Sequence, residues 1–276
     1  MISIRPPAVA GLFYPAAPAE LRRAVAALLA AAAPAAPAAQ AKPVPKALIA
    51  PHAGYVYSGA VAAAAYARLA PARDIIKRVV LLGPVHRVPI RGLACPAASL
   101  MSTPLGNLMV DAAALAALSL LPQVTRNDDA HAQEHSLEVQ LPFLQTVLTG
   151  FSVVPLAVGD ATADEVAQVL EALWGGAETL IVVSSDLSHY LGYGEAQATD
   201  RGTAQAILDL RSGISHEQAC GGTPLNGLLL AARHHQLEPE LIDLRNSGDT
   251  AGDRSRVVGY GAFAFCTPRS GASLVH

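Results

Sequence analysis

The chain has 276 residues, of which 52% are hydrophobic and 15% are charged, and its formal net charge is -3. This length suits one large domain or two small ones, because single hydrophobic cores stop growing at about 250–300 residues. The near-balanced charge, with no block of lysine or arginine, excludes the electrostatic footprint of a nucleic-acid-binding protein. The mean hydropathy of +0.34 comes largely from alanine, and no apolar run approaches the roughly 20 residues that a membrane span needs.

The cellular compartment is predicted from the N-terminus and the cysteines. Residues 1–7 lack the apolar core of a signal peptide. Only three cysteines occur, Cys95, Cys220 and Cys266, and they imply no disulfide framework. We therefore expect a cytoplasmic protein in a reducing compartment, with no membrane partner and no nucleic-acid partner.

The first quarter of the chain is rich in proline and alanine. Residues 1–16 are too proline-rich for regular structure and are expected to form an extended arm. A helix is predicted over residues 17–33, followed by an Ala/Pro linker over residues 34–45. A short apolar strand follows from about Lys46 to Pro51, and Ser58 is expected to cap a helix that ends near Leu69.

The next predicted strand, residues 78–84, is apolar on both faces, as a central parallel strand should be. Short strands and turns are expected over residues 93–108, and Asp111 is expected to cap a short helix. A longer helix is predicted over residues 134–148, with Pro142 marking a kink or a boundary.

Strands and helices alternate through the rest of the chain. Strands are predicted at residues 152–158 and 179–186, and helices at residues 162–174, 195–210 and 224–235.

Two alternating strands close the chain, at residues 238–246 and 256–265, with a turn-rich loop between them and a flexible tail over residues 268–276. The alternation of strands and helices predicts an α/β fold with a mostly parallel or mixed central sheet flanked by helices. We expect a single domain over residues 1–276.

Three of the predicted strands end in residues that can carry chemistry. His52 follows the first and His86 the second. The third runs into Asp186 and His189. Parallel strands place such ends at one edge of a sheet, where ligands bind. Imidazole and carboxylate groups suit a divalent metal, and two histidines with one carboxylate favour Fe(II) and oxygen chemistry.

These residue types also have roles that involve no metal. A single histidine after a strand is more often a surface or hydrogen-bonded residue, and no HExxH or CxxC spacing is present. Cys220 precedes a predicted helix, whose N-terminus would lower the pKa of a thiol and favour a nucleophile or a metal ligand. A small buried hydrophobic residue is an equal alternative for Cys220, and burial is favoured for Cys95 and Cys266.

Residues 131–136 contain a second group of candidates. His131 is expected to lie outside the following helix, so His131 and His135 should not share a metal ion. Glu134 is interpreted as a helix-capping or ligand-orienting carboxylate, and His135 as lining a pocket. The glycine-rich segment at 190–194 is not a nucleotide-binding loop, and Ser184 and Ser185 lack the Gly-x-Ser-x-Gly elbow.

Six segments, in this order along the chain, resemble the MEMO family. They are Arg-Pro-Pro-Ala-Val-Ala-Gly-Leu-Phe-Tyr-Pro at 5–15, Pro-His-Ala-Gly-Tyr-Val-Tyr-Ser-Gly at 51–59, Leu-Gly-Pro-Val-His at 82–86, Glu-His-Ser-Leu-Glu at 134–138, Ser-Ser-Asp-Leu-Ser-His at 184–189 and Arg-Ser-Arg-Val-Val-Gly-Tyr at 254–260. Prokaryotic members are labelled AmmeMemoRadiSam system protein B. That label implies association with an AMMECR1-domain protein and a radical SAM protein.

The resemblance also implies a fold like LigB and the class III extradiol dioxygenases, which are non-haem Fe(II) enzymes. It implies a metal pocket formed by His52, His86 and Cys220, with Asp186 and His189 beside it. The dioxygenases have a glutamate where Cys220 would be the third ligand, and a thiolate shifts metal preference toward copper or zinc. Whether Cys220 or Asp186 is the third ligand stays open at this point.

Three hypotheses follow. The first is a metal-dependent, oxidoreductase-like protein that binds Fe(II), or alternatively Cu or Zn. In it His189 is the general acid/base, Asp186 orients a ligand or binds the metal, and Tyr55 and Tyr190 line the pocket. The second is a non-catalytic binding or assembly module, whose pocket holds a small molecule, a peptide or the tail of a partner. The third is thiol chemistry at Cys220 without a metal.

Overall fold

The computed structural model describes residues 3–32 and 42–268. The first two residues of the predicted arm, residue 33 of the predicted helix, residues 34–41 of the predicted linker and residues 269–276 of the predicted tail lie outside the described residues. Among the described helices, none has both the length and the apolar character that crossing a membrane requires.

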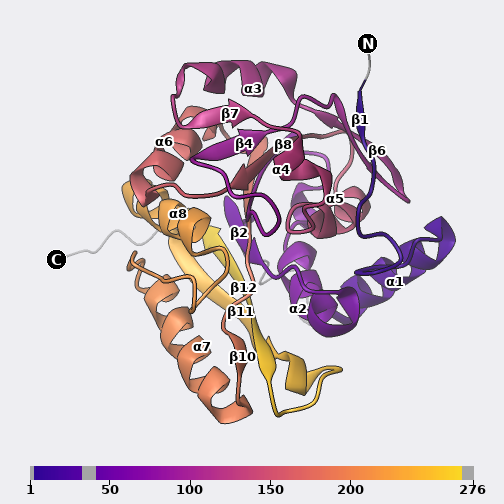
Figure 1. The fold of residues 1–276 in the computed structure, drawn as a ribbon, viewed down its shortest axis with the longest axis vertical. Coiled ribbons are helices and arrows are strands. Elements are labelled where there is room, and N and C mark those ends of the chain that lie inside the picture. The colour runs from indigo at the N-terminus through magenta and orange to yellow at the C-terminus, as the bar shows by residue number, and fades with distance from the viewer. Residues whose placement is uncertain (1–2, 33–41, 269–276) are drawn as a thin grey trace.

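A mixed sheet of twelve strands forms the centre of the described chain (Figure 1). Four parallel strands occupy its middle, in the order β8 (Ser152–Val158), β3 (Arg78–Pro84), β9 (Thr179–Ser184) and β2 (Ala47–Ala50). Strand β3 has a parallel neighbour on each side and is buried along nearly its whole length, which confirms the prediction of a central parallel strand.

The C-terminal strands extend the sheet beyond β2. Strand β12 (Val257–Cys266) is antiparallel to β2, to β11 (Glu238–Asn246) and to the short strand β10 (His189–Leu191). The predicted pair of terminal strands is therefore confirmed. The three-residue strand β10 was not predicted, because so short a segment carries no alternation of its own.

The opposite side of the sheet is built from short strands. β6 (Gly106–Val110) follows β8 and leads to β5 (Leu100–Thr103) and then β1 (Ile4–Arg5). β4 (Leu93–Cys95) pairs with β8 and with β7 (Val124–Arg126).

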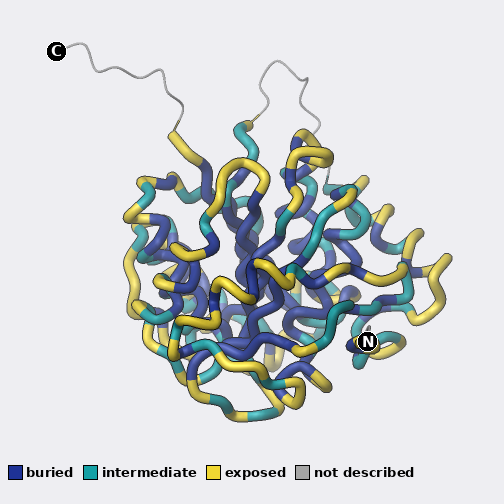
Figure 2. The backbone as a smooth tube through the Cα atoms, turned by 90° about the horizontal axis from the view of Figure 1, so that it is seen from above, coloured by how far each residue is buried: buried dark blue, intermediate teal, exposed yellow. Residues whose placement is uncertain are grey.

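Helices cover both faces of the sheet (Figure 1). One group contains α1 (Pro18–Ala32), α2 (Tyr55–Ala67) and α5 (Leu141–Val147). The other contains α6 (Ala163–Leu173), α7 (Tyr193–Leu208) and α8 (Gly222–His234). The sheet strands between them form the buried centre of the molecule (Figure 2). The predicted α/β fold with a mixed sheet and flanking helices is confirmed.

The remaining helices are short: α3 (Ala112–Ala117), α4 (Asp129–Ala132) and the 3-10 helices η2 (Ala70–Ala72), η3 (Leu118–Leu120), η4 (Glu138–Gln140) and η5 (Ser247–Asp249). The predicted cap of α3 is confirmed, because the Asp111 carboxylate accepts a hydrogen bond from the backbone N of Ala114. At α6, Thr162 and Glu165 cap each other's backbone N–H groups.

Three local predictions were wrong. Helix α2 begins at Tyr55 after the N-cap Gly54, and the Ser58 hydroxyl donates to the carbonyl of Ala53 inside its first turns. Residues 134–148 do not form one helix but an irregular segment followed by η4 and α5. Pro142 lies in the first turn of α5, so the predicted boundary at this proline is confirmed. His131 lies inside α4 rather than outside a helix, and its Nε2 donates to the carbonyl of Ala94.

Candidate metal centre

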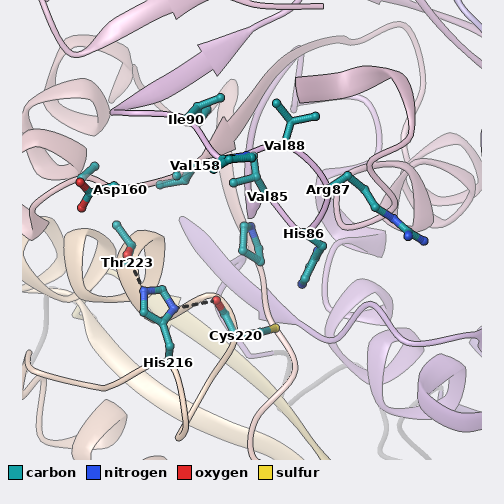
Figure 3. Close-up of a pocket in the computed structure, with 14 residues that line it drawn as sticks. Val85, His86, Arg87, Val88, Ile90, Val158, Asp160, His216, Cys220 and Thr223 are labelled. Atoms are coloured by element: carbon teal, nitrogen blue, oxygen red, sulfur yellow. Dashed lines mark hydrogen bonds between the residues drawn. The ribbon is translucent and has the colours of Figure 1, made fainter. Parts of the chain in front are cut away.

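Three predicted ligands meet at the carboxyl edge of the parallel strands. His52 follows β2, His86 follows β3, and Cys220 lies just before α8. One ligand atom from each residue lies within 4.8 Å of the others. The Cys220 Sγ is 3.3 Å from the His52 Nε2. Figure 3 shows His86, from the segment after β3, and Cys220, from the segment before α8, beside each other. The structure therefore brings together residues up to 168 positions apart in sequence.

The imidazole of His52 is held in one tautomer. Its Nδ1 lies 2.9 Å from the Ser184 Oγ, while the Ser184 hydroxyl donates its own hydrogen to the Ser136 carbonyl at 2.6 Å. The Ser184 oxygen must therefore accept from His52, so Nδ1 carries the proton and Nε2 presents a lone pair toward Cys220. Burial and the neighbouring imidazoles of His135 and His86 lower the pKa of His52 well below its usual value, which keeps the ring neutral.

The imidazole of His86 is oriented in the same way by Glu134. The His86 Nδ1 lies 2.9 Å from the Glu134 carboxylate and must donate to it, which leaves Nε2 free. The backbone N–H groups of His86, His135 and Ser136 also donate to this carboxylate. Burial alone would raise the pKa of Glu134, but these hydrogen bonds outweigh burial and lower the pKa to about 2. A carboxylate behind a ligating histidine is a common feature of metal sites.

The variant Glu134→Gln is expected to lower the affinity for a divalent metal by about 10–100-fold, the loss typical for carboxylates that orient ligating histidines. The amide cannot accept from all the groups that Glu134 now serves, and it carries no charge. Competition titration against a chromophoric chelator measures the change. The exposed Glu195→Gln is the matched control, and equal affinities for the two variants would contradict this role of Glu134.

The position of Cys220 before a helix predicted a lowered pKa for its thiol, and this prediction was wrong, because the pKa is raised. Burial, together with the Asp186 carboxylate, raises the pKa of Cys220 to about 12. Hydrogen bonds from the Ser185 hydroxyl and from the backbone at Gly221, the N-cap of α8, lower the pKa, but burial outweighs them. Without a cation the sulfur is therefore a thiol, and a bound divalent metal would deprotonate it.

Asp186 lies beneath the turn that carries His52. Its Oδ1 accepts from the backbone N of His52 at 2.7 Å and of Ala53 at 3.3 Å. Burial raises the pKa of Asp186 to about 6, against the opposing effect of these hydrogen bonds. The group of three converging ligand atoms includes Cys220 and not Asp186, so the geometry gives Asp186 the part of a positioning residue for His52.

His189 is half-buried at the start of β10. Its Nδ1 lies 2.8 Å from the carbonyl of Leu187 and must donate to it. The Nε2 atom is therefore the nitrogen available for proton exchange.

His135 was predicted to line the pocket, and its ring lies directly beside the rings of the candidate ligands His86 and His52. Its ring centroid is 4.5 Å from that of His86 and 5.4 Å from that of His52. Phe13 of the N-terminal arm packs on it at 4.7 Å. The His135 Nδ1 lies 3.3 Å from the Glu134 carboxylate but without hydrogen-bond geometry, and burial lowers the pKa of His135 to about 4.

The two predicted tyrosines are not among the residues that line the cavity beside His86 and Cys220. The Tyr55 hydroxyl donates to the carbonyl of Val139, and its ring packs on Phe143 within the core. Tyr190 is 63% exposed, has a positive φ of 60°, and contacts the guanidinium of Arg256.

A cavity of about 650 Å³ adjoins the candidate ligands His86 and Cys220 (Figure 3). One wall is apolar and includes Val85, Ile90 and Val158. Polar groups line the remainder, including Asp160 and the hydrogen-bonded pair His216 and Thr223. A small molecule in this cavity would therefore lie beside His86 and Cys220.

Known proteins match the chain over nearly its whole length. A family model described as Memo-like protein matches residues 5–264. The chain belongs to the MEMO family. A MEMO1 family protein of Methanopyrus kandleri is 36% identical over 95% of this chain and 98% of its own length. A MEMO1 family protein of Aquifex aeolicus is 34% identical over 93% of this chain and 97% of its own length.

Among solved structures, the crystal structure of an uncharacterized protein from Escherichia coli K12 aligns with 78% of this MEMO-family chain and 98% of that chain. The two are 14% identical and superpose with a TM-score of 0.46.

Sequence reasoning missed two residues that fix the first ligand in this MEMO-family protein. Ser184 sets the tautomer of His52, and the Gln140 side-chain amide donates to the Ser184 Oγ and to the carbonyl of Pro51. Gln140 lies at the end of η4 and Ser184 at the end of β9. The sequence shows a serine at the end of a predicted strand and a glutamine in another segment, but only the tertiary structure shows that the two side chains meet.

Proposed function

We propose that this MEMO-family protein binds a divalent transition metal through His52, His86 and Cys220 and acts as a metal-dependent oxidoreductase. One observation carries the proposal. Two imidazoles are each held by a hydrogen bond at Nδ1, and one ligand atom from each of them and the Cys220 sulfur lie within 4.8 Å of one another.

The donor set fits a metal ion. Metal–nitrogen bonds of about 2.0–2.1 Å and metal–sulfur bonds of about 2.3 Å place donor atoms roughly 3.5 Å apart, close to the 3.3 Å between the Cys220 Sγ and the His52 Nε2. Fe(II) is the proposed metal, and Cu or Zn suit the same donors. Three protein ligands leave coordination positions open, as in catalytic sites.

The residues around the donors support chemistry on a bound small molecule. A redox-active metal would supply Lewis acidity and electron transfer. The cavity beside His86 and Cys220 admits the substrate, and its apolar wall excludes water from one side. His189 exchanges a proton through Nε2, while Asp186 holds the backbone of His52 in place.

Partners of the protein are proposed from the family resemblance. We propose an AMMECR1-domain protein and a radical SAM protein. A non-catalytic assembly module remains the competing function, and co-purification with those two partners without any metal would favour it.

Metal analysis of the full chain, purified without chelator, tests the proposed function. We expect one equivalent of metal that is lost in the double variant His52→Ala with His86→Ala, because a single thiol cannot retain a divalent ion. The control His216→Ala removes a histidine that contacts the Cys220 carbonyl but not its sulfur, and it should keep the metal.

Metal content that is unchanged in the double variant would overturn the assignment of these ligands. A double variant that is unfolded by circular dichroism would be replaced by His52→Gln alone, which keeps a hydrogen-bonding side chain.

A further inference from the structure

A second group of metal-ligating side chains lies on the outer layer of helices. Glu171 is in the last turns of α6, and His234 and His235 are at the C-terminal end of α8. One ligand atom from each lies within 4.8 Å of the others. The His235 Nε2 is 2.8 Å and 3.1 Å from the two Glu171 oxygens.

The ring of His235 is held in place by Trp174. The two rings are stacked with centroids 3.7 Å apart and planes 9° apart. The side chain of Lys46 fixes the tryptophan in turn, since its Nζ donates to the Trp174 carbonyl and lies 5.3 Å from the ring centroid. A ligand that is already immobilised loses little conformational entropy when it binds a metal.

The charges around the group favour a cation. Asp164 lines the same cavity as Glu171 and His234, so two carboxylates face this surface. Arg233 is the cationic neighbour of His234 in the sequence, and its guanidinium is bonded to the carbonyl of Leu210.

We propose that Glu171, His234 and His235 form a second binding site for a divalent transition metal, separate from the candidate centre at His52, His86 and Cys220. Two imidazoles and one carboxylate are ligands that Zn²⁺ and Cu²⁺ accept. The close approach of His235 to Glu171 fits this site, because a metal would replace the proton that the two groups share. The half-exposed side chains leave further positions for water.

The two sites lie at opposite ends of strand β2. Lys46, which contacts Trp174, precedes the strand, and His52 follows it. Six residues of extended chain span roughly 20 Å. Trp174 is the one tryptophan of the chain, so its fluorescence reports on metal at His235 and not on metal at His52.

Titration of Cu²⁺ into the full-length variant His52→Ala with Cys220→Ser tests the site without the central ligands. We expect saturable quenching of the Trp174 emission with one equivalent of Cu²⁺, because a paramagnetic ion on a stacked imidazole quenches by contact. A large excess of Zn²⁺, which binds such donors less tightly than Cu²⁺, should displace the copper and restore the emission. This outcome does not depend on whether the central site binds metal.

Two further variants, made in the same background, keep the stacked pair intact and remove one ligand each. Glu171→Gln and His234→Ala should each weaken Cu²⁺ binding by at least about tenfold, since even partners that only orient ligands contribute 10–100-fold. Glu195→Gln, on α7, is the matched control and should bind as its parent does. Absence of saturable quenching, or quenching unaltered by both Glu171→Gln and His234→Ala, would overturn the proposal and leave Glu171 and His235 as a surface ion pair.

Discussion

Replacement of Glu138 by alanine is expected to lower the free energy of unfolding by about 3–5 kcal/mol, the loss typical when one partner of a buried ion pair is removed. Glu138 is fully buried and pairs with Arg5, whose side chain is 6% exposed. Its carboxylate also accepts from the Tyr14 hydroxyl and from the backbone N–H groups of Ala8 and Val9. The substitution would leave a buried guanidinium and several buried donors without that acceptor.

The loss of Glu138 should also disturb the packing around the candidate metal centre. These hydrogen bonds anchor the N-terminal arm, and the arm places Phe13 against His135. The Phe13 carbonyl additionally accepts from the backbone N of Tyr55 at the start of α2. A released arm would therefore uncover His135 and loosen the helix that follows the His52 turn.

Urea unfolding followed by circular dichroism measures this prediction. The midpoint urea concentration should fall in proportion to the lost free energy of unfolding, because the slope of that free energy against urea concentration is set by the surface exposed on unfolding. The exposed Glu195→Ala should stay within about 0.5 kcal/mol of the parent. The double variant Arg5→Met with Glu138→Leu should recover part of the loss, because it removes the unpaired charge. A change below about 1 kcal/mol in Glu138→Ala would contradict an anchoring role.

The strand ends could be predicted because their signal is local. Strands β3 and β9 are apolar on both faces, and such runs occur only where helices cover a parallel sheet on both sides. Their polar ends then fall at the same edge. This reasoning located His52 and His86 correctly beside each other, and the resemblance to a family supplied Cys220, which no local pattern links to a strand end.

The region around 134–148 could be predicted only in part, because its acidic residues bond to partners that are distant in sequence. Glu134 bonds to His86, 48 positions earlier, and Glu138 bonds to the arm, more than 120 positions earlier. The sequence indicated a ligand-orienting carboxylate at Glu134, which agrees with its hydrogen bond to His86, but it did not name His86 as the partner. Nothing local in the sequence indicates that Glu138 bonds to the arm. The thiol of Cys220 shows the same limit, since a helix N-terminus predicts a lowered pKa and burial beside Asp186 raises it.

Replacement of Cys220 by serine is expected to remove the sulfur-to-metal charge-transfer band that the Co²⁺-loaded protein should show in the near ultraviolet. The band requires a metal–thiolate bond, and the Cys220 Sγ is the sulfur beside the His52 Nε2 among the described residues. Affinity for Zn²⁺ should fall by more than about 10–100-fold, the loss seen when only an orienting partner is removed. Absorption spectroscopy with a competing chelator measures both effects.

Cys220→Asp separates the loss of sulfur from the loss of a ligand. An aspartate would convert the donor set to two histidines and one carboxylate, the arrangement of non-haem Fe(II) sites. This variant should lack the charge-transfer band but bind Fe(II) more tightly than Cys220→Ser does, because a charged oxygen replaces a neutral one. Cys95→Ser, a substitution in a cysteine remote from the ligands, should keep the band. A band that survives in Cys220→Ser would show that another thiol holds the metal, and the pocket at His52 and His86 would then lack its third ligand.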